Sequence, residues 1–303
     1  MTRTIGVVAA LSKDEAAELA SEIGAWLRER GCRVVLEEEL DAGAAQRADA
    51  IVVLGGDGLM MRVAKRYPGV PLLGINFGKV GFLAAVERRD WPDALEALLA
   101  GDYKLEDNST LAAEVHHAGR SEAGDDGPGL GPTDDQGWAI NDVTIRSGVR
   151  MVDVEVYIDG RYVNTFPGDG MIVSTARGST AYGMAAGGPI LTAGVKGFAI
   201  VPISCHSPIR IPMVVAEETL IEVLLASDHE ASLIIDGRPT LELRRGDVVA
   251  VRRGTNRFRL VSLESTDFYQ AFRTKFNFQI RPDAVPTRRP TRVGRSAERT
   301  PAR

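Results

Sequence analysis

The residues with the clearest chemical meaning form a glycine-rich turn near residue 55. An apolar run over residues 51–54 leads into Gly55, Gly56, Asp57 and Gly58, and a helical pattern follows. Glycines let backbone N–H groups approach an anion closely, and a helix N-terminus adds partial positive charge. A carboxylate in the middle of such a phosphate cradle is suited to binding Mg²⁺, to accepting a hydroxyl proton, or to both. The turn therefore indicates a phosphate site with Asp57 as its reactive group, and a plain strand-to-helix turn is the alternative.

A second polar segment runs from Asp169 to Tyr182. It gathers four Ser and Thr hydroxyls around the start of a helix built of small residues. Such hydroxyls, together with the N–H groups of a helix start, suit a ligand that carries phosphate or ribose. The ring of Tyr182 could stack on a base. A tightly packed helix that needs small residues is the alternative.

Asn141 and Asp142 form the third feature, because they interrupt an apolar run over residues 139–145. Polar side chains inside an apolar strand are costly unless they meet partners. Adjacent strand residues point to opposite faces, so both can meet one ligand only where a bulge or a strand end intervenes. The pair is therefore a candidate ligand contact, and a turn at Asn141 is the alternative.

The first third of the chain must position the glycine turn, and its pattern alternates strand with helix. We expect strands over residues 4–9, 32–36, 48–54 and 71–75, and helices over residues 14–29, 60–67 and 91–99. Strands that alternate with helices predict a parallel sheet covered on both faces. The glycine turn then follows the third of these strands.

After about residue 103 the pattern changes to short alternating strands, which predict an antiparallel β domain. We expect strands over residues 111–116, 138–145, 152–158, 162–165, 171–174, 220–225, 232–235, 240–243, 248–251 and 258–263, and a helix over residues 178–186. A late helix over residues 265–276 and a strand over residues 276–280 follow. The expected domains are an N-terminal α/β domain over residues 1–103, with residues 265–281 returning to it, and a β domain over residues 104–264. Residues 119–137 are expected to form a solvated insertion, and residues 282–303 a disordered tail.

The composition narrows the class of protein. The 303 residues are 44% hydrophobic and 25% charged, which is ordinary for a globular chain, and no apolar run approaches the ~18 residues of a membrane span. Two cysteines, Cys32 and Cys205, exclude a disulfide scaffold and a cysteine-based zinc site, and fit a cytoplasmic location. The net charge of −5 argues against nucleic acid as a partner.

Familiar phosphate motifs are missing from the sequence. Residues 74–80 carry glycines and a lysine, but their spacing is wrong for a P-loop. No Gly-x-Gly-x-x-Gly follows the first strand, which disfavours a standard dinucleotide fold with hydride chemistry.

Taken together, the three features resemble the NAD kinase family, whose members use ATP or polyphosphate. The resemblance covers residues 51–278 and includes the segments 76–83 and 268–275. The glycine turn alone is weak, because phosphofructokinases and diacylglycerol-type lipid kinases share it, but its combination with Asn141, Asp142 and residues 169–182 is specific. The resemblance implies a Rossmann-like α/β domain and a C-terminal antiparallel β domain, the NAD kinase/diacylglycerol kinase-like fold. It also implies a homodimer or homotetramer.

The same resemblance implies roles for individual residues. Asp57 would accept or orient the proton of the adenosine 2′-hydroxyl of NAD, while Mg²⁺ neutralises charge on the phosphate oxygens of the donor, so that NADP is formed. The glycines of the turn would hold donor phosphates, Asn141 and Asp142 would contact adenosine, and residues 180–185 would line the NAD pocket. The full set of implied binding residues is Gly55, Gly56, Gly58, Arg62, Phe77, Asn141, Asp142, Arg150, Asp169, Arg177, Thr180, Ala181, Tyr182, Gly183, Met184 and Ala185.

The sequence departs from the family pattern at several of these positions. Arg177 stands where Thr or Ser is usual, and its guanidinium could pair with a phosphate, pair with Asp169, or point to solvent. Asp142 replaces a commoner Glu, Arg238 a common Gln, and Gly183 a residue that is often polar. These changes bear on the choice of donor and on the preference between NAD and NADH.

Two other functions stay open on the sequence alone. One is a lipid or sugar kinase that shares the glycine turn, although it does not explain Asn141 and Asp142. The other is a non-catalytic NAD(P)-binding protein, which the changes at Arg177 and Gly183 motivate and Asp57 argues against.

Overall fold

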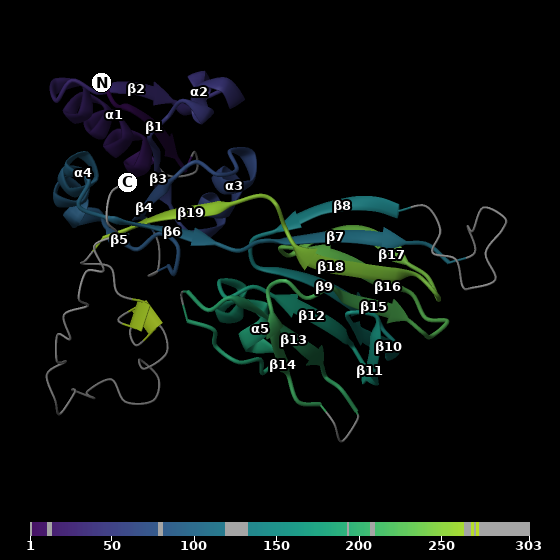
Figure 1. The fold of residues 1–303 in the computed structure, drawn as a ribbon. Helices are drawn as coiled ribbons and strands as arrows, with labels where there is room; N and C mark the ends of the chain where they lie inside the picture. The colour runs from purple at the N-terminus through teal and green to yellow at the C-terminus, as the bar shows by residue number, and fades with distance from the viewer. Residues whose placement is uncertain are drawn as a thin grey trace, which may run out of the picture.

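The computed structural model describes residues 2–10, 14–77, 81–118, 133–192, 194–206, 210–263, 268–269 and 271–272. It contains an α/β unit and a β unit of two sheets (Figure 1), which confirms the expected fold class. Of the expected insertion over residues 119–137, residues 119–132 lie outside the described residues. The same holds for most of the expected helix over residues 265–276, for the strand over residues 276–280 and for the tail from residue 282.

A mostly parallel sheet, here called sheet A, is the centre of the α/β unit. Its strands lie in the order β2 (Arg33–Leu36), β1 (Thr4–Ala9), β3 (Ala50–Gly55), β4 (Leu72–Asn76), β19 (Phe258–Ser262) and β6 (Lys104–Asn108), with β5 (Val86–Glu87) paired to β4. Strand β6 runs antiparallel to β19, and the other pairs are parallel. Apolar residues fill β3 completely because helices cover both of its faces.

Four helices cover sheet A. Helices α1 (Asp14–Glu29) and α4 (Trp91–Ala100) pack on one face, and α2 (Ala42–Gln46) and α3 (Asp57–Arg66) pack on the other, with 3-10 turns η1 (Glu37–Glu39) and η2 (Arg88–Asp90) between them. Helix α1 buries a stripe that contains Leu19, Ile23 and Leu27, at the spacing of one helical face. None of the helices in the described part of the chain is both long and apolar enough to cross a bilayer.

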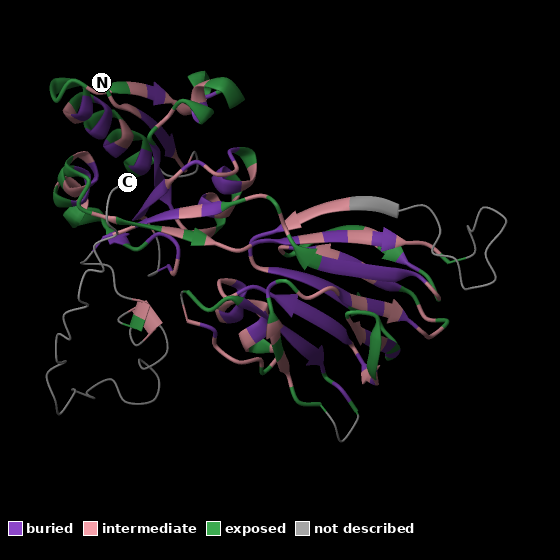
Figure 2. Cartoon of the chain, viewed as in Figure 1, coloured by how far each residue is buried: buried purple, intermediate pink, exposed green. Residues whose placement is uncertain are grey.

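Two antiparallel sheets form the β unit. Sheet B has the order β11 (Arg161–Gly168), β10 (Val152–Ile158), β15 (Ile221–Leu225), β18 (Val248–Arg253), β7 (Leu111–His116) and β8 (Thr133–Ala139). Sheet C has the order β14 (Met213–Ala216), β13 (Gly197–Ile203), β12 (Gly170–Ser174), β9 (Asp142–Ser147), β16 (Ala231–Ile235) and β17 (Arg238–Leu243). The two sheets enclose one buried apolar cluster, visible as buried strand positions in Figure 2. The η3 turn (Gly178–Thr180) and α5 (Tyr182–Ala185) cover the outer face of sheet C.

Within the described residues, the chain crosses between the two units twice, from β6 to β7 and from β18 to β19. Strands β6 and β19 both belong to sheet A, although they lie inside residues 104–264, the span that the sequence pattern assigns to the β domain. Alternation of apolar residues marks a strand but does not tell which sheet the strand joins.

Local structure also differs from the sequence expectation in the β unit and in the α/β unit. The expected strand over residues 138–145 is divided into β8 and β9, and the expected helix over residues 178–186 is divided at Ala181 into η3 and α5. Strands β5, β6, β13 and β14 and helix α2 were not expected. Strand β13 is buried along its whole length because the sandwich core covers one face and α5 the other, so it shows no alternation.

Candidate active site between the two units

Asp57 is the first residue of α3 and lies directly after the buried strand β3. Its carboxylate accepts hydrogen bonds from three successive backbone N–H groups in the loop after β4. The N–H of Phe82 donates to Oδ2 at 2.9 Å, and those of Leu83 and Ala84 donate to Oδ1 at 3.0 and 3.2 Å. Three donors from one loop fix the direction of the carboxylate at the start of the helix.

Glycines on both sides of Asp57 serve different purposes. A Cβ at Gly81 would lie 2.1 Å from Oδ1 of Asp57, so the loop can approach the carboxylate only with a glycine there. A Cβ at Gly56 or Gly58 would meet no atom within 4 Å, so the N-terminal end of α3 borders open space. A phosphate in that space would meet the backbone N–H groups of the helix start.

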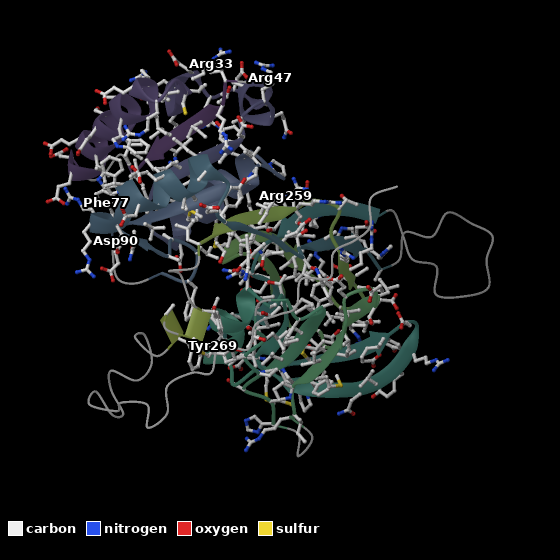
Figure 3. The ribbon with its side chains drawn as sticks, turned by 60° about the vertical axis from the view of Figure 1, so that its left-hand side comes forward. Arg33, Arg47, Phe77, Asp90, Arg259 and Tyr269 are labelled. Atoms are coloured by element: carbon white, nitrogen blue, oxygen red, sulfur yellow. The ribbon has the colours of Figure 1, made fainter. Side chains whose placement is uncertain are left out.

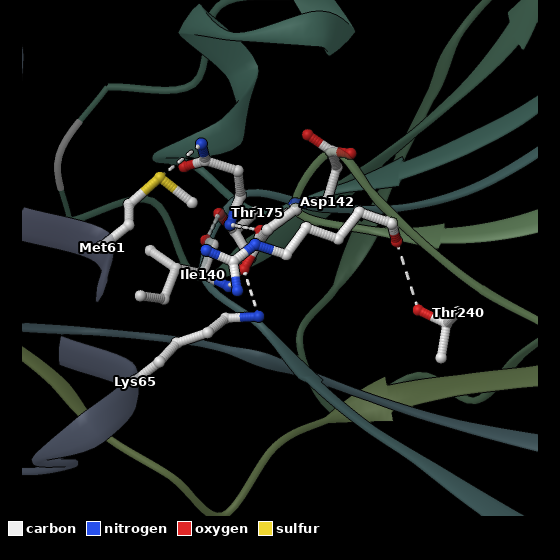
Figure 4. Close-up of polar contacts among 9 residues, drawn as sticks. Met61, Lys65, Ile140, Asp142, Thr175 and Thr240 are labelled. Atoms are coloured by element: carbon white, nitrogen blue, oxygen red, sulfur yellow. Dashed lines mark hydrogen bonds and ion pairs between the residues drawn. The ribbon is translucent and has the colours of Figure 1, made fainter. Parts of the chain in front are cut away.

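The second polar element is the turn between β8 and β9. The carboxylate of Asp236, in the connection from β16 to β17, accepts hydrogen bonds from the N–H groups of Ile140, Asn141 and Asp142 at 2.9, 2.7 and 3.2 Å. Thr175 closes the turn from the other side, because its Oγ1 donates to the Ile140 carbonyl at 2.7 Å and its N–H donates to the Asn141 carbonyl at 2.9 Å (Figure 4). A strand end is therefore present at Asn141 and Asp142.

Helix α3 joins the Asp57 end of the α/β unit to this turn of the β unit. The Nδ2 of Asn141 donates to Sδ of Met61 at 3.3 Å, and the Nζ of Lys65 lies 2.9 Å from Oδ2 of Asp236 (Figure 4). Ile140 is fully buried in the same apolar cluster as the inner side of α3. Burial of such a side chain contributes about 1.5–3 kcal/mol, so the helix and the turn are held together.

Asp142 is buried, and its Oδ1 accepts a hydrogen bond from the Thr144 hydroxyl at 3.1 Å. Its pKa is raised to about 6, first because burial disfavours the charged form and second because the Asp236 carboxylate lies nearby. The hydrogen bond from Thr144 and the ammonium group of Lys65 oppose this rise. Asp142 therefore changes its charge close to neutral pH.

Arg177 reaches from the loop after β12 to strand β6 of the α/β unit. Its Nε donates to Oδ1 of Asn108 at 2.8 Å, and its Nη2 pairs with Oε2 of Glu106. Burial lowers the pKa of Arg177, whereas the carboxylates of Glu106 and Asp57 raise it. The guanidinium is thus buried against Glu106, within the electrostatic reach of Asp57, and does not point to solvent.

The four hydroxyls of the segment from Asp169 to Tyr182 all donate to backbone carbonyl groups. Ser174 donates to Thr175 O at 3.1 Å, Thr175 to Ile140 O at 2.7 Å, Ser179 to Ala176 O at 2.6 Å and Thr180 to Arg177 O at 3.1 Å. These hydrogen bonds stabilise an irregular segment that short helices alone would not hold. Ser174, Thr175 and Ser179 are buried, so among these hydroxyls that of the half-buried Thr180 is the one a ligand could meet, as an acceptor.

Asp169 and Tyr182 lie toward the other end of the ladder between β9 and β12. The last residue of β12 pairs with Asp142, and its first residue pairs with Arg146, whose guanidinium carbon lies 5.9 Å from the centre of the Tyr182 ring. Four residues of strand separate the two ends, about 14 Å at ~3.4 Å per residue.

A hollow of about 840 Å³ begins directly after α5. Ala186, Ser204, His206 and Arg210 form part of its lining. The sequence pattern does not indicate this hollow, because Ser204 and His206 follow strand β13, whose buried residues show no alternation.

Comparison with known proteins identifies the family. A model of the ATP-NAD kinase N-terminal domain matches residues 38–103, and one of the ATP-NAD kinase C-terminal domain matches residues 140–263. The NAD kinase of Thermomicrobium roseum is 55% identical over 289 residues, which cover 95% of this chain and 96% of that protein. The chain belongs to the NAD kinase family. The NAD kinase of Syntrophotalea carbinolica is 34% identical and covers 91% of this chain and 99% of its own length.

Solved structures of NAD kinases share the fold. Yeast NADH kinase complexed with NADH superposes with a TM-score of 0.78 at 18% identity, covering 95% of this chain and 90% of that one. An NAD kinase from Archaeoglobus fulgidus in complex with ATP has a TM-score of 0.70 at 24% identity, covering 89% of this chain and 98% of that one. The α/β unit followed by a β unit is therefore the architecture of this family.

Three binding residues implied by the NAD kinase resemblance lie at the margin of the site. The Nη2 of Arg62, on α3, lies 3.3 Å from Oε1 of Glu37, so this side chain turns toward η1. Phe77 follows β4 (Figure 3). Its N–H donates to the Gly55 carbonyl at 3.0 Å. Arg150 is exposed in the hairpin between β9 and β10, at the Asp169 end of β9.

Other residues that shape this NAD kinase site were not assigned from the sequence. They are Gly81, Lys65, Glu106 and Asp236. The dipeptide Asp236-Gly237 signals a turn, and Asp236 indeed has a positive φ of 49°. That its carboxylate would be buried against the β8–β9 turn depends on the packing of strands far apart in the chain.

Proposed function

We propose that this NAD kinase family member transfers the terminal phosphoryl group of ATP to the adenosine 2′-hydroxyl of NAD with Asp57 at the reacting centre. The observation that carries the proposal is the position of the Asp57 carboxylate. It lies at the start of α3 in the electrostatic reach of Arg177, while the same helix contacts Asn141 of the β unit. A carboxylate, open space beside a helix N-terminus and a polar turn of the other unit therefore meet at one boundary.

The donor would bind with its phosphates at the N-terminal end of α3. Gly56 and Gly58 leave space there that a Cβ would occupy. Among the residues that the structure describes, no group of three or more His, Cys, Asp or Glu could hold a metal ion. Mg²⁺ is commonly held by one or two carboxylates together with substrate phosphates and water, so Asp57 with the donor phosphates fits this cation. Mg²⁺ would neutralise charge on the phosphate oxygens.

Asp57 would orient the 2′-hydroxyl or accept its proton. As the hydroxyl oxygen bonds to the terminal phosphorus, the bond to the leaving ADP breaks, and the proton passes to the carboxylate. The hydrogen bonds from the loop that follows Gly81 keep the carboxylate in one direction, so the carboxylate does not have to reorient during the transfer.

NAD would extend from the Asn141–Asp142 end to the Asp169–Tyr182 end of the ladder between β9 and β12, whose own residues are almost all buried. Asn141 and Asp142 would contact its adenosine, and Asp169 and Tyr182 would contact the portion about 14 Å away. Residues 180–185 would line the pocket between these ends. Arg177 would contribute to phosphate binding although Glu106 offsets its charge, and unchanged Michaelis constants for both substrates in Arg177→Thr would contradict that role.

One assay tests the function. Purified protein with NAD, ATP and Mg²⁺ is expected to form NADP, and Asp57→Asn is expected not to. Phosphorylation of a lipid or sugar instead of NAD would establish the other kinase function, and binding of NAD without turnover a non-catalytic one. Parallel reactions with polyphosphate and with NADH identify the donor and the preferred acceptor.

We also propose that the protein assembles into a homodimer or homotetramer. The edge strand β14 carries an exposed Val214, and Ile211 just before it is 72% exposed. Apolar side chains beside an open sheet edge favour pairing with another chain. A monomer in sedimentation equilibrium at micromolar concentration would contradict this.

A further inference from the structure

Asp236 occupies an unusual position for a residue of an Asp-Gly turn. Such residues are commonly exposed, but the side chain of Asp236 is 3% exposed. Its two oxygens accept the N–H groups of three consecutive residues, Ile140, Asn141 and Asp142. One carboxylate therefore determines the backbone course of the whole β8–β9 turn.

Lys65 supplies the positive charge that this buried carboxylate requires. Its Nζ lies 2.9 Å from Oδ2 of Asp236 and 5.6 Å from the centre of the Trp138 ring, and its side chain is 29% exposed. A buried carboxylate that loses its cation is strongly destabilised. Lys65 belongs to α3 and follows Asp57 by eight residues, about 12 Å of helix at ~1.5 Å per residue. The ion pair thus fixes the distance between the turn and the helix that begins with Asp57.

We propose that Lys65 and Asp236 are a positioning pair, which holds the Asn141–Asp142 turn against α3 and so aligns the bound dinucleotide with Asp57. This inference rests on the proposed contact of Asn141 and Asp142 with the adenosine of NAD. Neither Lys65 nor Asp236 has to touch a substrate for this role. Loss of the pair is expected to weaken the use of NAD while the donor site at Gly56 and Gly58 stays intact.

The charges around Asp142 provide a second readout, which reports whether Lys65 and Asp236 lie beside the turn as the structure shows. The groups that face its carboxyl are Asp236 from the β16–β17 connection, Lys65 from α3 and the hydroxyl of Thr144 from its own strand. Removal of Lys65 raises the pKa of Asp142 further, since the cation opposes the rise. Removal of the negative charge of Asp236 lowers it. The two substitutions are therefore expected to shift an Asp142 titration in opposite directions.

The test measures kcat and KM for NAD and for ATP between pH 5 and pH 9 in Lys65→Met, Lys65→Arg and Asp236→Asn. Lys65→Met is expected to raise KM for NAD about tenfold, equivalent to ~1.4 kcal/mol, with KM for ATP changed less than about twofold. Lys65→Arg is expected to restore most of the affinity. The inflection near pH 6 in kcat/KM for NAD is expected to move up in Lys65→Met and down in Asp236→Asn. Arg66→Met is the matched control, because Arg66 is the exposed neighbour on the same helix.

Asn141→Ala separates failure of this inference from failure of the proposed adenosine contact. If Asn141→Ala raises KM for NAD but Lys65→Met does not, the positioning pair is refuted and the contact stands. If neither substitution changes KM for NAD, both are refuted. Equal shifts of the pH profile in one direction also refute the pair. Lys65→Met, whose folding is checked by its thermal transition, decides the question alone if Asp236→Asn does not fold.

Discussion

Replacing Asp142 by Asn is expected to stabilise the protein at neutral and alkaline pH. Asp142 is 5% exposed, and the pKa of its carboxyl is raised to about 6 from an ordinary value of 3.8. The unfolded chain therefore releases this proton more easily than the folded one. The contribution of this carboxyl to the free energy of unfolding of the wild type is fully present below about pH 3.8 and is lost as the pH rises through about 6. An amide at this position keeps an acceptor for the Thr144 hydroxyl and carries no charge at any pH.

The magnitude follows from the two pKa values. A tenfold change in proton affinity is ~1.4 kcal/mol, so the difference between 3.8 and about 6 corresponds to about 3 kcal/mol of lost stability above pH 7. Asp142→Asn is therefore expected to raise the free energy of unfolding by up to about 3 kcal/mol at pH 8. The advantage is expected to disappear near pH 4, where the wild-type carboxyl is protonated in the folded state.

Urea unfolding of both proteins at pH 4, 6 and 8 measures this difference. Asp153→Asn, at an exposed position on β10, is the matched control and is expected to change stability by less than about 0.5 kcal/mol at each pH. A difference between Asp142→Asn and wild type that stays the same from pH 4 to pH 8 would refute the reasoning. So would a variant that is less stable than wild type at pH 8.

Three further predictions concern the boundary between the two units. Asp57→Asn is expected to abolish turnover, which kcat measures, and a near-wild-type rate would exclude Asp57 from the reaction. The same substitution is expected to lower the free energy of unfolding in urea by about 1–3 kcal/mol, because an amide group would then face a loop N–H group. Gly81→Ala is expected to displace the Asp57 carboxylate and to lower kcat at least ~100-fold. The control Gly148→Ala, whose Cβ would meet open space, is expected to leave kcat unchanged, and equal rates in the two variants would contradict the steric argument. Arg177→Thr is expected to lower the free energy of unfolding by about 1–3 kcal/mol through loss of its pair with Glu106; a loss below about 0.5 kcal/mol would show that the pair contributes little.

Local patterns in the sequence predicted most of the strands and helices, and they singled out the residues of the candidate site. The residue types alone predicted the buried strand β3, the glycine turn and the helix that follows, because each of these depends on neighbours in the chain. Because adjacent residues on a strand face opposite sides, Asn141 and Asp142 could meet one ligand only at a bulge or a strand end, and a strand end is present there. Strand β13 was missed because its two covered faces remove the alternation that marks a half-buried strand.

Contacts between the two units could not be predicted from the sequence. Glu106 lies on a short polar strand, and nothing in its neighbours indicates that it pairs with Arg177. Lys65 and Asp236 are 171 positions apart, and they meet because the fold brings α3 to the connection between β16 and β17. Such pairs depend on the relative placement of whole sheets, which periodicity does not encode.

The place of β19 in sheet A has a consequence for how the chain acquires its structure. This strand lies between β4 and β6, yet it comes after the entire β unit in the order of synthesis. Until residues 258–262 leave the ribosome, β6 has no neighbour in the sheet, and the edge of β4 stays without one of its partners. The α/β unit is therefore completed last although it begins first. A nascent chain that stops before residue 258 is expected to carry a finished sandwich beside an unfinished sheet.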